Sequence, residues 1–133
     1  MDKYLQTNSS YNRLWMEYNK YGSLIVAVDL DCTLYDFHKD GSTYEMVRQL
    51  VRDLKKIDCF IIIWTANEDI KFVNTFLFEN KIPFDTINEN APFVKFSSRK
   101  IYYNVLIDDR SGISQVYKDL TKLVKNVRKN KLS

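Results

Sequence analysis

The sequence contains few of the residues that cross-link, interrupt or anchor a chain. Its 133 residues include only two cysteines, two prolines, three glycines and one histidine. The cysteines, Cys32 and Cys59, are too few for a disulfide framework or a cysteine-rich zinc site. The scarcity of proline and glycine leaves little linker material, and the length suits one domain rather than two. We therefore expect a single domain over residues 1–133.

Long apolar runs are also missing. The longest extends from Cys59 to Trp64, whereas a helix that spans a bilayer needs about 20 apolar residues. The first residues, MDKYLQ, lack the basic start and apolar stretch of a secretory signal peptide. With 45% apolar and 28% charged residues, the composition is that of a globular protein. These features predict a cytoplasmic protein that does not bind a membrane.

Positive charge is concentrated near the C-terminus. The net charge is +3, yet residues 118–133 alone carry six basic residues against one acid. Such a tail is more often the solvated end of a helix than a binding surface. Nucleic acid stays open as a partner of this tail, although the sequence contains no recognisable nucleic-acid-binding motif.

Strands and helices are expected to alternate along the chain. Short apolar runs predict strands, and apolar residues at a spacing of three and four predict helices. Alternation of this kind predicts a parallel sheet with right-handed crossovers, an α/β fold. The expected strands are 24–28, 59–64, 84–87 and 103–107, and the expected helices lie in an N-terminal extension (1–22), after 42 or 43, at 68–80 and in a basic C-terminal helix (113–133).

Acidic side chains follow two of these expected strands. Asp29 and Asp31 come directly after the first strand, and Asp108 with Asp109 follows the last. In a parallel sheet the carboxyl ends of the strands meet at one edge, where ligands bind. Carboxylates that gather there repel one another unless a cation lies between them. Oxygen ligands of this kind suit Mg²⁺, which commonly shares its coordination shell with a phosphate.

Groups that bind phosphate are expected at the same edge. Thr65 follows the second strand with a hydroxyl, and the backbone N–H groups of Ala66 and Asn67 are expected at a helix start, an anion-binding position. Lys100 lies on a long loop that can reach the edge, and the neighbouring Arg99 is a second candidate for that role. Acids, magnesium, a hydroxyl and a lysine together predict a site for phosphoryl transfer.

These residues resemble the four motifs of the haloacid dehalogenase (HAD) superfamily of phosphohydrolases. "DLDCT" (29–33) resembles the DxDxT motif, and Thr65 in "IIIWTAN" resembles the second motif. Lys100 in "SSRKIYYN" resembles the third and "LIDD" (106–109) the fourth, in the family's order over residues 23–112. The chain also resembles small, largely uncharacterised HAD hydrolases of bacteria and phages. The resemblance implies a three-layer α/β/α Rossmann-like fold, and the intervals between motifs leave no room for a cap domain.

The resemblance also implies roles for individual residues. Asp29 would be the nucleophile that forms an aspartyl-phosphate, and Asp31 the general acid/base. Thr33 would brace the loop that follows. Mg²⁺ would be bound by Asp29, the backbone carbonyl of Asp31, and the pair Asp108 and Asp109, with Asp109 preferred as the direct ligand. The transferring phosphate would be held by Leu30, Thr65, Ala66 and Lys100. Contacts to the substrate are expected from Asn67, from Arg110 and from the loop that overhangs the site, which carries Tyr35, Phe37 and His38.

The substrate and several alternatives stay open at this point. The resemblance implies a phosphomonoester substrate, whether a nucleotide, a nucleic-acid end or a phosphoprotein. A chain without a cap cannot by itself enclose a small substrate. The resemblance implies either a large substrate or a lid provided by another subunit, and within this chain only the N-terminal helix and the basic tail could cover the site. Cys32 as a nucleophile is disfavoured, because His38 is the only histidine available to activate it. The alternative function is a catalytically weak or inactive module that binds a phosphate or a partner.

Overall fold

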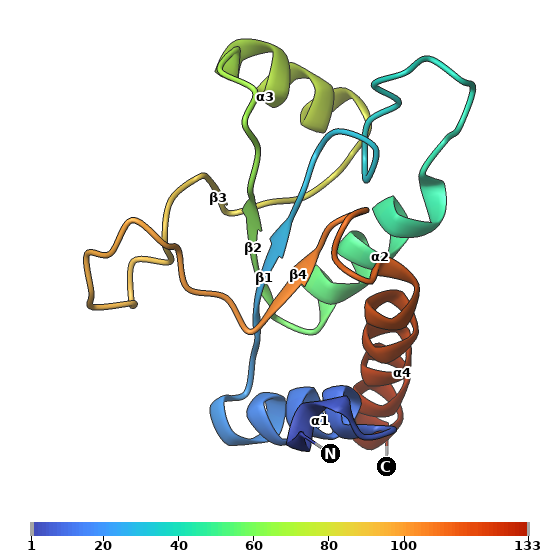
Figure 1. Ribbon diagram of the computed structural model, residues 1–133, viewed down its shortest axis with the longest axis vertical. Coiled ribbons are helices and arrows are strands. Elements are labelled where there is room, and N and C mark those ends of the chain that lie inside the picture. The colour runs from blue at the N-terminus through green and yellow to red at the C-terminus, as the bar shows by residue number, and fades with distance from the viewer. Residues whose placement is uncertain (1, 133) are drawn as a thin grey trace.

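The computed structural model describes residues 2–132 of the chain. Within this range, four strands form one parallel sheet in the order β3-β2-β1-β4, so that β1 lies between β2 and β4 (Figure 1). The elements are η1 (Lys3–Leu5, a 3-10 helix), α1 (Ser9–Tyr21), β1 (Ile25–Val28), α2 (Glu45–Lys56), β2 (Phe60–Ile63), α3 (Ile70–Glu79), β3 (Thr86–Ile87), β4 (Val105–Ile107) and α4 (Ile113–Lys131).

The main core lies on one face of the sheet. Successive side chains of a strand point to opposite faces, so alternate residues such as Val26 and Val28 of β1 share this face. Ile61 and Ile63 of β2 join them, and buried residues of all four α-helices pack against this set. Removal of these aliphatic side chains from water is the dominant stabilising contribution, at about 25 cal/mol per Å² of apolar surface.

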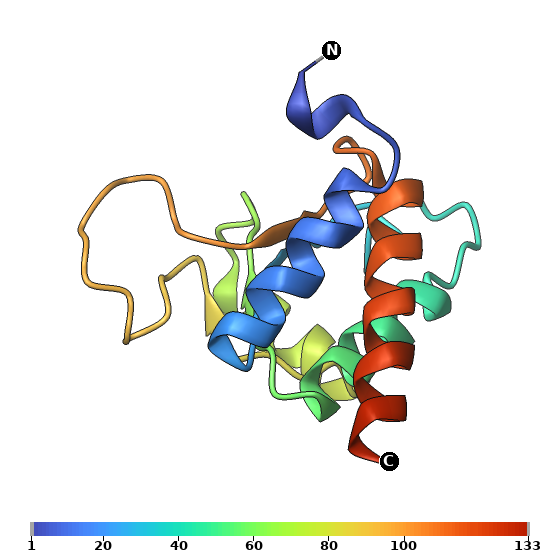
Figure 2. The ribbon, with the colours of Figure 1, turned by 90° about the horizontal axis from the view of Figure 1, so that it is seen from below.

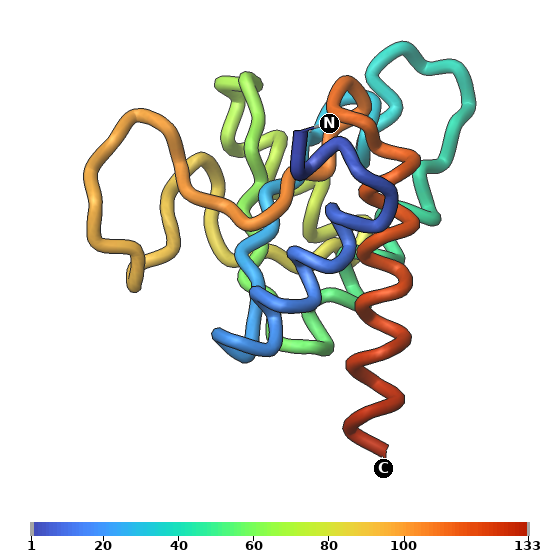
Figure 3. The backbone as a smooth tube through the Cα atoms, turned by 60° about the horizontal axis from the view of Figure 1, so that its bottom comes forward, coloured from blue at the N-terminus to red at the C-terminus, as the bar shows by residue number. Residues whose placement is uncertain are grey.

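The opposite face is covered by an irregular segment, residues 88–104, which we call the β3–β4 segment. A smaller cluster forms here between Ile25, Ala27 and Ile62 of the sheet and Ala91 and Ile101 of the segment. Figure 3 shows the segment as a wide loop, in yellow and orange, on the side of the sheet away from α4. The three layers are therefore helices, sheet and extended chain.

The N-terminal helix is part of the core rather than an extension of it. α1 packs beside α4 (Figure 2), and the Ser10 hydroxyl donates a hydrogen bond of 2.6 Å to the buried carboxylate of Asp119. The Tyr11 hydroxyl accepts one of 2.8 Å from Asn126. The buried Tyr18 donates through its hydroxyl to the carbonyl of Ile57, at 2.8 Å.

α1 and the C-terminal end of α4 lie away from the carboxyl ends of the strands (Figure 1). α4 begins close to the end of β4 and runs toward the opposite end of the molecule, where α1 also lies (Figure 1). Its 19 residues correspond to roughly 28 Å of helix. The basic residues near the end of α4, and the helix α1, are therefore wrongly placed to act as a lid over that edge within one chain.

The predicted α/β architecture is confirmed. The sheet is parallel and Rossmann-like, helices cover the face with the main core, and no cap domain interrupts the described chain. The expected strands are each longer than the observed ones by one to two residues, which is the usual uncertainty of such boundaries. None of the helices within residues 2–132 has the length and apolar content that crossing a membrane requires.

Candidate functional site

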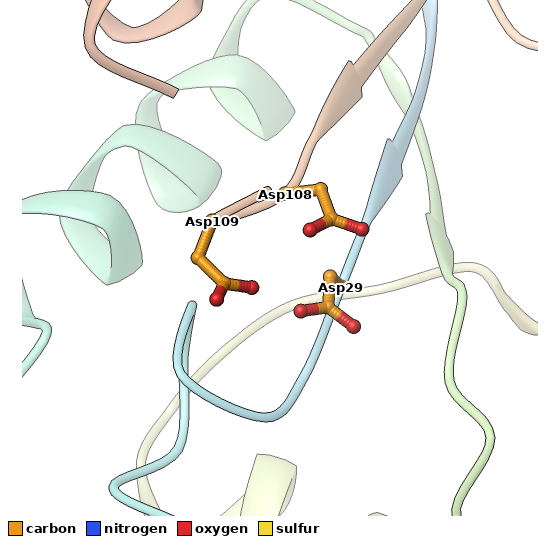
Figure 4. Close-up of side chains that lie close together, drawn as sticks. All are labelled: Asp29, Asp108 and Asp109. Atoms are coloured by element: carbon orange, nitrogen blue, oxygen red, sulfur yellow. The ribbon is translucent and has the colours of Figure 1, made fainter. Parts of the chain in front are cut away.

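Three carboxylates converge at the carboxyl ends of β1 and β4. Asp29 follows β1, and Asp108 and Asp109 follow β4; one oxygen from each lies within 4.8 Å of the others. Figure 4 shows the three carboxylates turned toward a common point. The Asp29 N–H donates to the Ile107 carbonyl at 2.9 Å, which ties the two strand ends together. The convergence expected from the sequence is therefore present for these three acids.

Thr33 joins these two strand ends through its side chain. Its hydroxyl oxygen, in a fully buried residue, accepts a hydrogen bond of 3.1 Å from the backbone N–H of Asp109. The same hydroxyl lies 3.1 Å from Oδ2 of Asp29 and 3.3 Å from Oδ1 of Asp109, and its one proton can be donated to either. The threonine thus sets the separation of the two carboxylates as well as bracing its own loop.

A tight turn brings Thr33 back beneath Asp29. The Leu30 carbonyl accepts hydrogen bonds from the N–H groups of Thr33, Leu34 and Tyr35. Cys32 adopts a left-handed conformation (φ 62°), which is uncommon for a residue with a side chain. The turn also buries Leu30 in the main core, so its side chain anchors the loop.

The electrostatics of the site favour a bound cation. Burial first, and then the negative charge of Asp108, raise the pKa of Asp29 to about 7. Asp31 has a buried oxygen, Oδ1, that makes no hydrogen bond within the described structure. Desolvation, followed by the charge of Asp109, also raises the pKa of the Cys32 thiol, which disfavours its reactive thiolate.

The acids open into a cavity of about 350 Å³, which we call the acid pocket. Asp31 lines it together with the three converging carboxylates, and Cys32, Phe37, His38 and Arg110 complete the lining. Phe37 and His38 are exposed on the loop after Tyr35, with their rings edge to face at 5.2 Å. The Asp36 carboxylate holds this loop by accepting the N–H groups of Asp40 and Gly41. Of the expected substrate contacts, Phe37, His38 and Arg110 are thus at the pocket.

Thr65 follows β2, so it also lies at the carboxyl ends of the strands, but on the side of β1 away from β4. Its backbone is held by the Asn88 side chain, which accepts from the Thr65 N–H and donates to its carbonyl, both at 2.8 Å. The expectation that Ala66 and Asn67 open a helix is wrong, because α3 begins at Ile70. The Asn67 N–H already donates to the Thr65 hydroxyl oxygen, at 3.1 Å.

The start of α3 is delayed by side-chain caps. Asn67 accepts the Asp69 N–H through Oδ1, and the Asp69 carboxylate accepts the N–H of Phe72 in the first turn of the helix. A carboxylate therefore occupies the anion-binding position at the start of this helix, where the sequence predicted a bound phosphate. Asn67 serves as a local cap, and it does not line the acid pocket.

Lys100 is not brought to the acid pocket, contrary to expectation. β4 runs toward the acids, so the residues that precede Val105 lie toward the amino ends of the strands. Ile101 is buried on the second face and fixes its neighbour there. Lys100 and Arg99 are exposed, and neither lines the pocket among the residues described. Arg110 is the cation that does.

Tyr35 and Leu30 also differ from their expected roles. Tyr35 packs edge to face on Phe72 and Phe76 of α3, at 5.2 and 5.1 Å, and does not line the pocket. Leu30 contributes its carbonyl to the turn and its side chain to the core. Phe37 lines the pocket beside His38, as expected for the loop that overhangs the site, whereas the role of Asn88 behind Thr65 was not predicted from the sequence. Asn88 follows β3 directly, so its place at a strand end was the available signal.

Comparison with known proteins supports the fold alone. The sequence matches no protein-family model and no curated protein. Among solved structures, a conserved protein of Bacteroides thetaiotaomicron is similar, with a TM-score of 0.62 and 19% sequence identity. The match covers 75% of this chain and 91% of that one. At this level of identity the similarity describes the arrangement of the sheet and helices.

Proposed function

We propose that this protein is a Mg²⁺-dependent phosphomonoester hydrolase of the HAD type. The observation that carries the proposal is the convergence of Asp29, Asp108 and Asp109 within 4.8 Å, with Asp31 lining the same pocket. All four acids lie at the edge of a parallel sheet where ligands bind. The two free cysteines fit a cytoplasmic location, which belongs to the same proposal.

The residues at this edge fit a divalent cation. Three carboxylate oxygens offer the hard ligands that Mg²⁺ prefers, and burial together with the negative charge of Asp108 raises the pKa of Asp29. Asp29, Asp108, Asp109 and the backbone carbonyl of Asp31 would hold the ion. When bound, it would supply positive charge to the phosphate oxygens and to the acids themselves.

Asp29 and Asp31 divide the chemistry. A carboxylate oxygen of Asp29 attacks the phosphorus while the bond to the leaving oxygen breaks, and Asp31 donates its proton to that oxygen. Asp31 then removes a proton from a water molecule, whose oxygen attacks the phosphorus. The bond between Asp29 and the phosphorus breaks, which releases inorganic phosphate and restores the carboxylate. Thr33 keeps Asp29 in position through both steps.

The substrate enters an open pocket. With no cap above it, the acid pocket is bordered by the exposed Phe37 and His38 on one loop and by Arg110 on another. Arg110 is the cation best placed to pair with phosphate oxygens. The substrate is therefore a phosphomonoester whose remaining part lies largely in solvent, and its chemical class stays open, as does the possibility that a second subunit covers the pocket.

One observation favours the alternative, a catalytically weak or inactive module that binds phosphate or a partner. Lys100, the expected partner of the phosphate, is exposed on the second face and lines no pocket with the acids. A site that lacks this charge would stabilise a phosphoryl-transfer transition state less well. Among the described residues that line the pocket, Arg110 is the only lysine or arginine, so it would have to supply the positive charge that Lys100 does not.

Hydrolysis of a panel of phosphomonoesters, with and without Mg²⁺, tests the proposal. The panel includes p-nitrophenyl phosphate, nucleoside monophosphates and a 5′-phosphorylated oligonucleotide. We expect activity that requires Mg²⁺ and that Asp29→Asn reduces by about three orders of magnitude or more. Asp58→Asn is the control, because Asp58 is exposed and outside the pocket. If no compound is hydrolysed, the hydrolase proposal fails in favour of the alternative function. If Asp29→Asn is as active as the wild type, Asp29 is not the nucleophile and the proposed mechanism is wrong.

A further inference from the structure

The β3–β4 segment presents aromatic rings to solvent. Phe93 is 62% exposed, Phe96 is 50% exposed and Tyr102 is 40% exposed. Large aromatic side chains normally contribute to a core, since each can bury a large apolar area. Three of them exposed on one segment of 17 residues (88–104) indicate a surface that is completed by another molecule.

These rings are held in place although they are exposed. Phe96 and Tyr102 pack edge to face at 6.0 Å, and Phe93 packs edge to face on Phe60 of β2 at 5.6 Å. The base of the segment is closed by a hydrogen bond of 2.7 Å from the Tyr102 N–H to Oδ1 of Asn90. In an edge-to-face pair the edge of one ring meets one face of the other, so the remaining ring faces stay available to a partner.

A groove runs beside these rings. Phe93 and Tyr102 line a cavity of about 540 Å³ whose other wall includes Tyr21, at the end of α1, and Ile25, at the start of β1. The groove therefore lies at the amino ends of the strands, whereas the acid pocket lies at their carboxyl ends. A partner bound here would not compete with the acids for space.

Positive charge is interleaved with the rings. Lys95, Arg99 and Lys100 are all exposed, and the sequence has no acid between Glu89 and Asp108. Among the described residues, one acid lines the groove, Asp58, and Lys131 pairs with it at 3.7 Å. A surface that alternates cations with flat apolar rings complements a partner that alternates negative charges with flat apolar rings.

We propose that the β3–β4 segment binds single-stranded nucleic acid. Bases stack on Phe93, Phe96 and Tyr102, while Lys95, Arg99 and Lys100 contact the phosphates between them. A duplex hides the faces of its bases in its own stack, so the rings favour a single strand. This binding is separate from the hydrolase proposed above, because it uses neither the acids nor a metal ion.

The basic end of α4 is a weaker candidate for the same role. Its cations Lys125, Arg128 and Lys129 are exposed, but no exposed aromatic residue is interleaved with them. Charge alone would bind single strands and duplexes in a similar, salt-sensitive way. Binding at the β3–β4 segment should therefore favour single strands over duplexes, whereas binding at α4 should not. The full-length chain can be used to measure this preference.

Fluorescence anisotropy with a dye-labelled oligothymidylate tests the proposal in EDTA, where metal-dependent hydrolysis is absent. We expect binding that favours the single strand over a duplex of equal length by tenfold or more, and that weakens as salt rises. Phe96→Ala should weaken binding by roughly 5- to 150-fold, as expected for the loss of one stacked base. Lys95→Ala should lower the slope of log affinity against log salt by roughly 0.7.

Matched variants keep this test specific. Phe78→Ala removes an aromatic residue that is 85% exposed on α3, and Lys71→Ala removes an exposed lysine of the same helix; both should bind as the wild type does. The proposal is overturned if the oligonucleotide does not bind, if Phe96→Ala binds equally well, or if duplex and single strand bind equally. It is also overturned if Lys125→Ala with Lys129→Ala weakens binding more than Phe96→Ala does, or if the wild type sediments as a dimer and Phe96→Ala as a monomer.

Discussion

The acid pocket and the β3–β4 segment concentrate opposite charges by different means. In the pocket, three acids are drawn together by two neighbouring strands and are tied through the hydroxyl of Thr33. In the segment, cations and aromatic rings are spread along an irregular chain that rests on the second face of the sheet. The first arrangement fixes a few atoms closely, as a reaction requires, whereas the second offers a broad surface, as recognition of a long partner requires.

The largest expected effect concerns the pocket. Asp31→Asn should lower the turnover of a phosphomonoester by roughly 10²- to 10⁴-fold, because it removes the group that gives and takes the proton. Mg²⁺ should still raise the Tm of the variant, since the other three carboxylates remain. Steady-state kinetics and thermal unfolding with and without Mg²⁺ measure the two effects. Unchanged turnover would remove Asp31 from the mechanism.

The next effect tests the link between the two strand ends. Thr33→Val keeps the shape of a fully buried side chain but leaves the Asp109 N–H and the Asp29 carboxylate without their shared partner. We expect a loss of about 1–3 kcal/mol in the free energy of unfolding, measured with urea. Thr33→Ser restores the hydroxyl and should recover most of the loss. Equal stability of the valine and serine variants would show that the hydroxyl is unimportant.

A smaller effect is expected from pH in EDTA. Because the pKa of Asp29 is raised to about 7, the folded chain keeps a proton that the unfolded chain loses near pH 4. The stability that this proton contributes is present below about pH 4 and is lost as pH rises through 7. The Tm of the metal-free protein should therefore fall more steeply over this range than that of Asp29→Asn. Parallel Tm profiles would contradict the raised pKa.

The smallest changes are expected when a variant of one region is tested for the activity of the other. Phe96→Ala should leave the turnover of p-nitrophenyl phosphate within about twofold of the wild type, because this substrate is too small to reach the segment. Asp31→Asn should leave the affinity for oligothymidylate in EDTA within the same range. A large loss in either experiment would mean that the two regions form one continuous site.

The acid pocket was largely predictable because its residues follow apolar strands. Asp29 and Asp108 occupy the position that the strand pattern assigns to them, and topology alone brings them together. The position predicted for Lys100 was wrong because the β3–β4 segment lacks a regular spacing of apolar residues. The sequence therefore gave no indication that Ile101 is buried on the second face. The start of α3 was misplaced because its position depends on hydrogen bonds made by the side chains of Asn67 and Asp69.

The covalent state of Asp29 during turnover tests the central claim most directly. Asp31→Asn is mixed with p-nitrophenyl phosphate and Mg²⁺, quenched rapidly in acid, and analysed by peptide mass spectrometry. The leaving group of this substrate needs little protonation, so the variant should form the aspartyl-phosphate and then hydrolyse it slowly. We predict the mass of one phosphoryl group on the peptide that contains Asp29, and its loss when Mg²⁺ is omitted. A phosphoryl group on another residue, or on none while p-nitrophenol is released, would contradict the account.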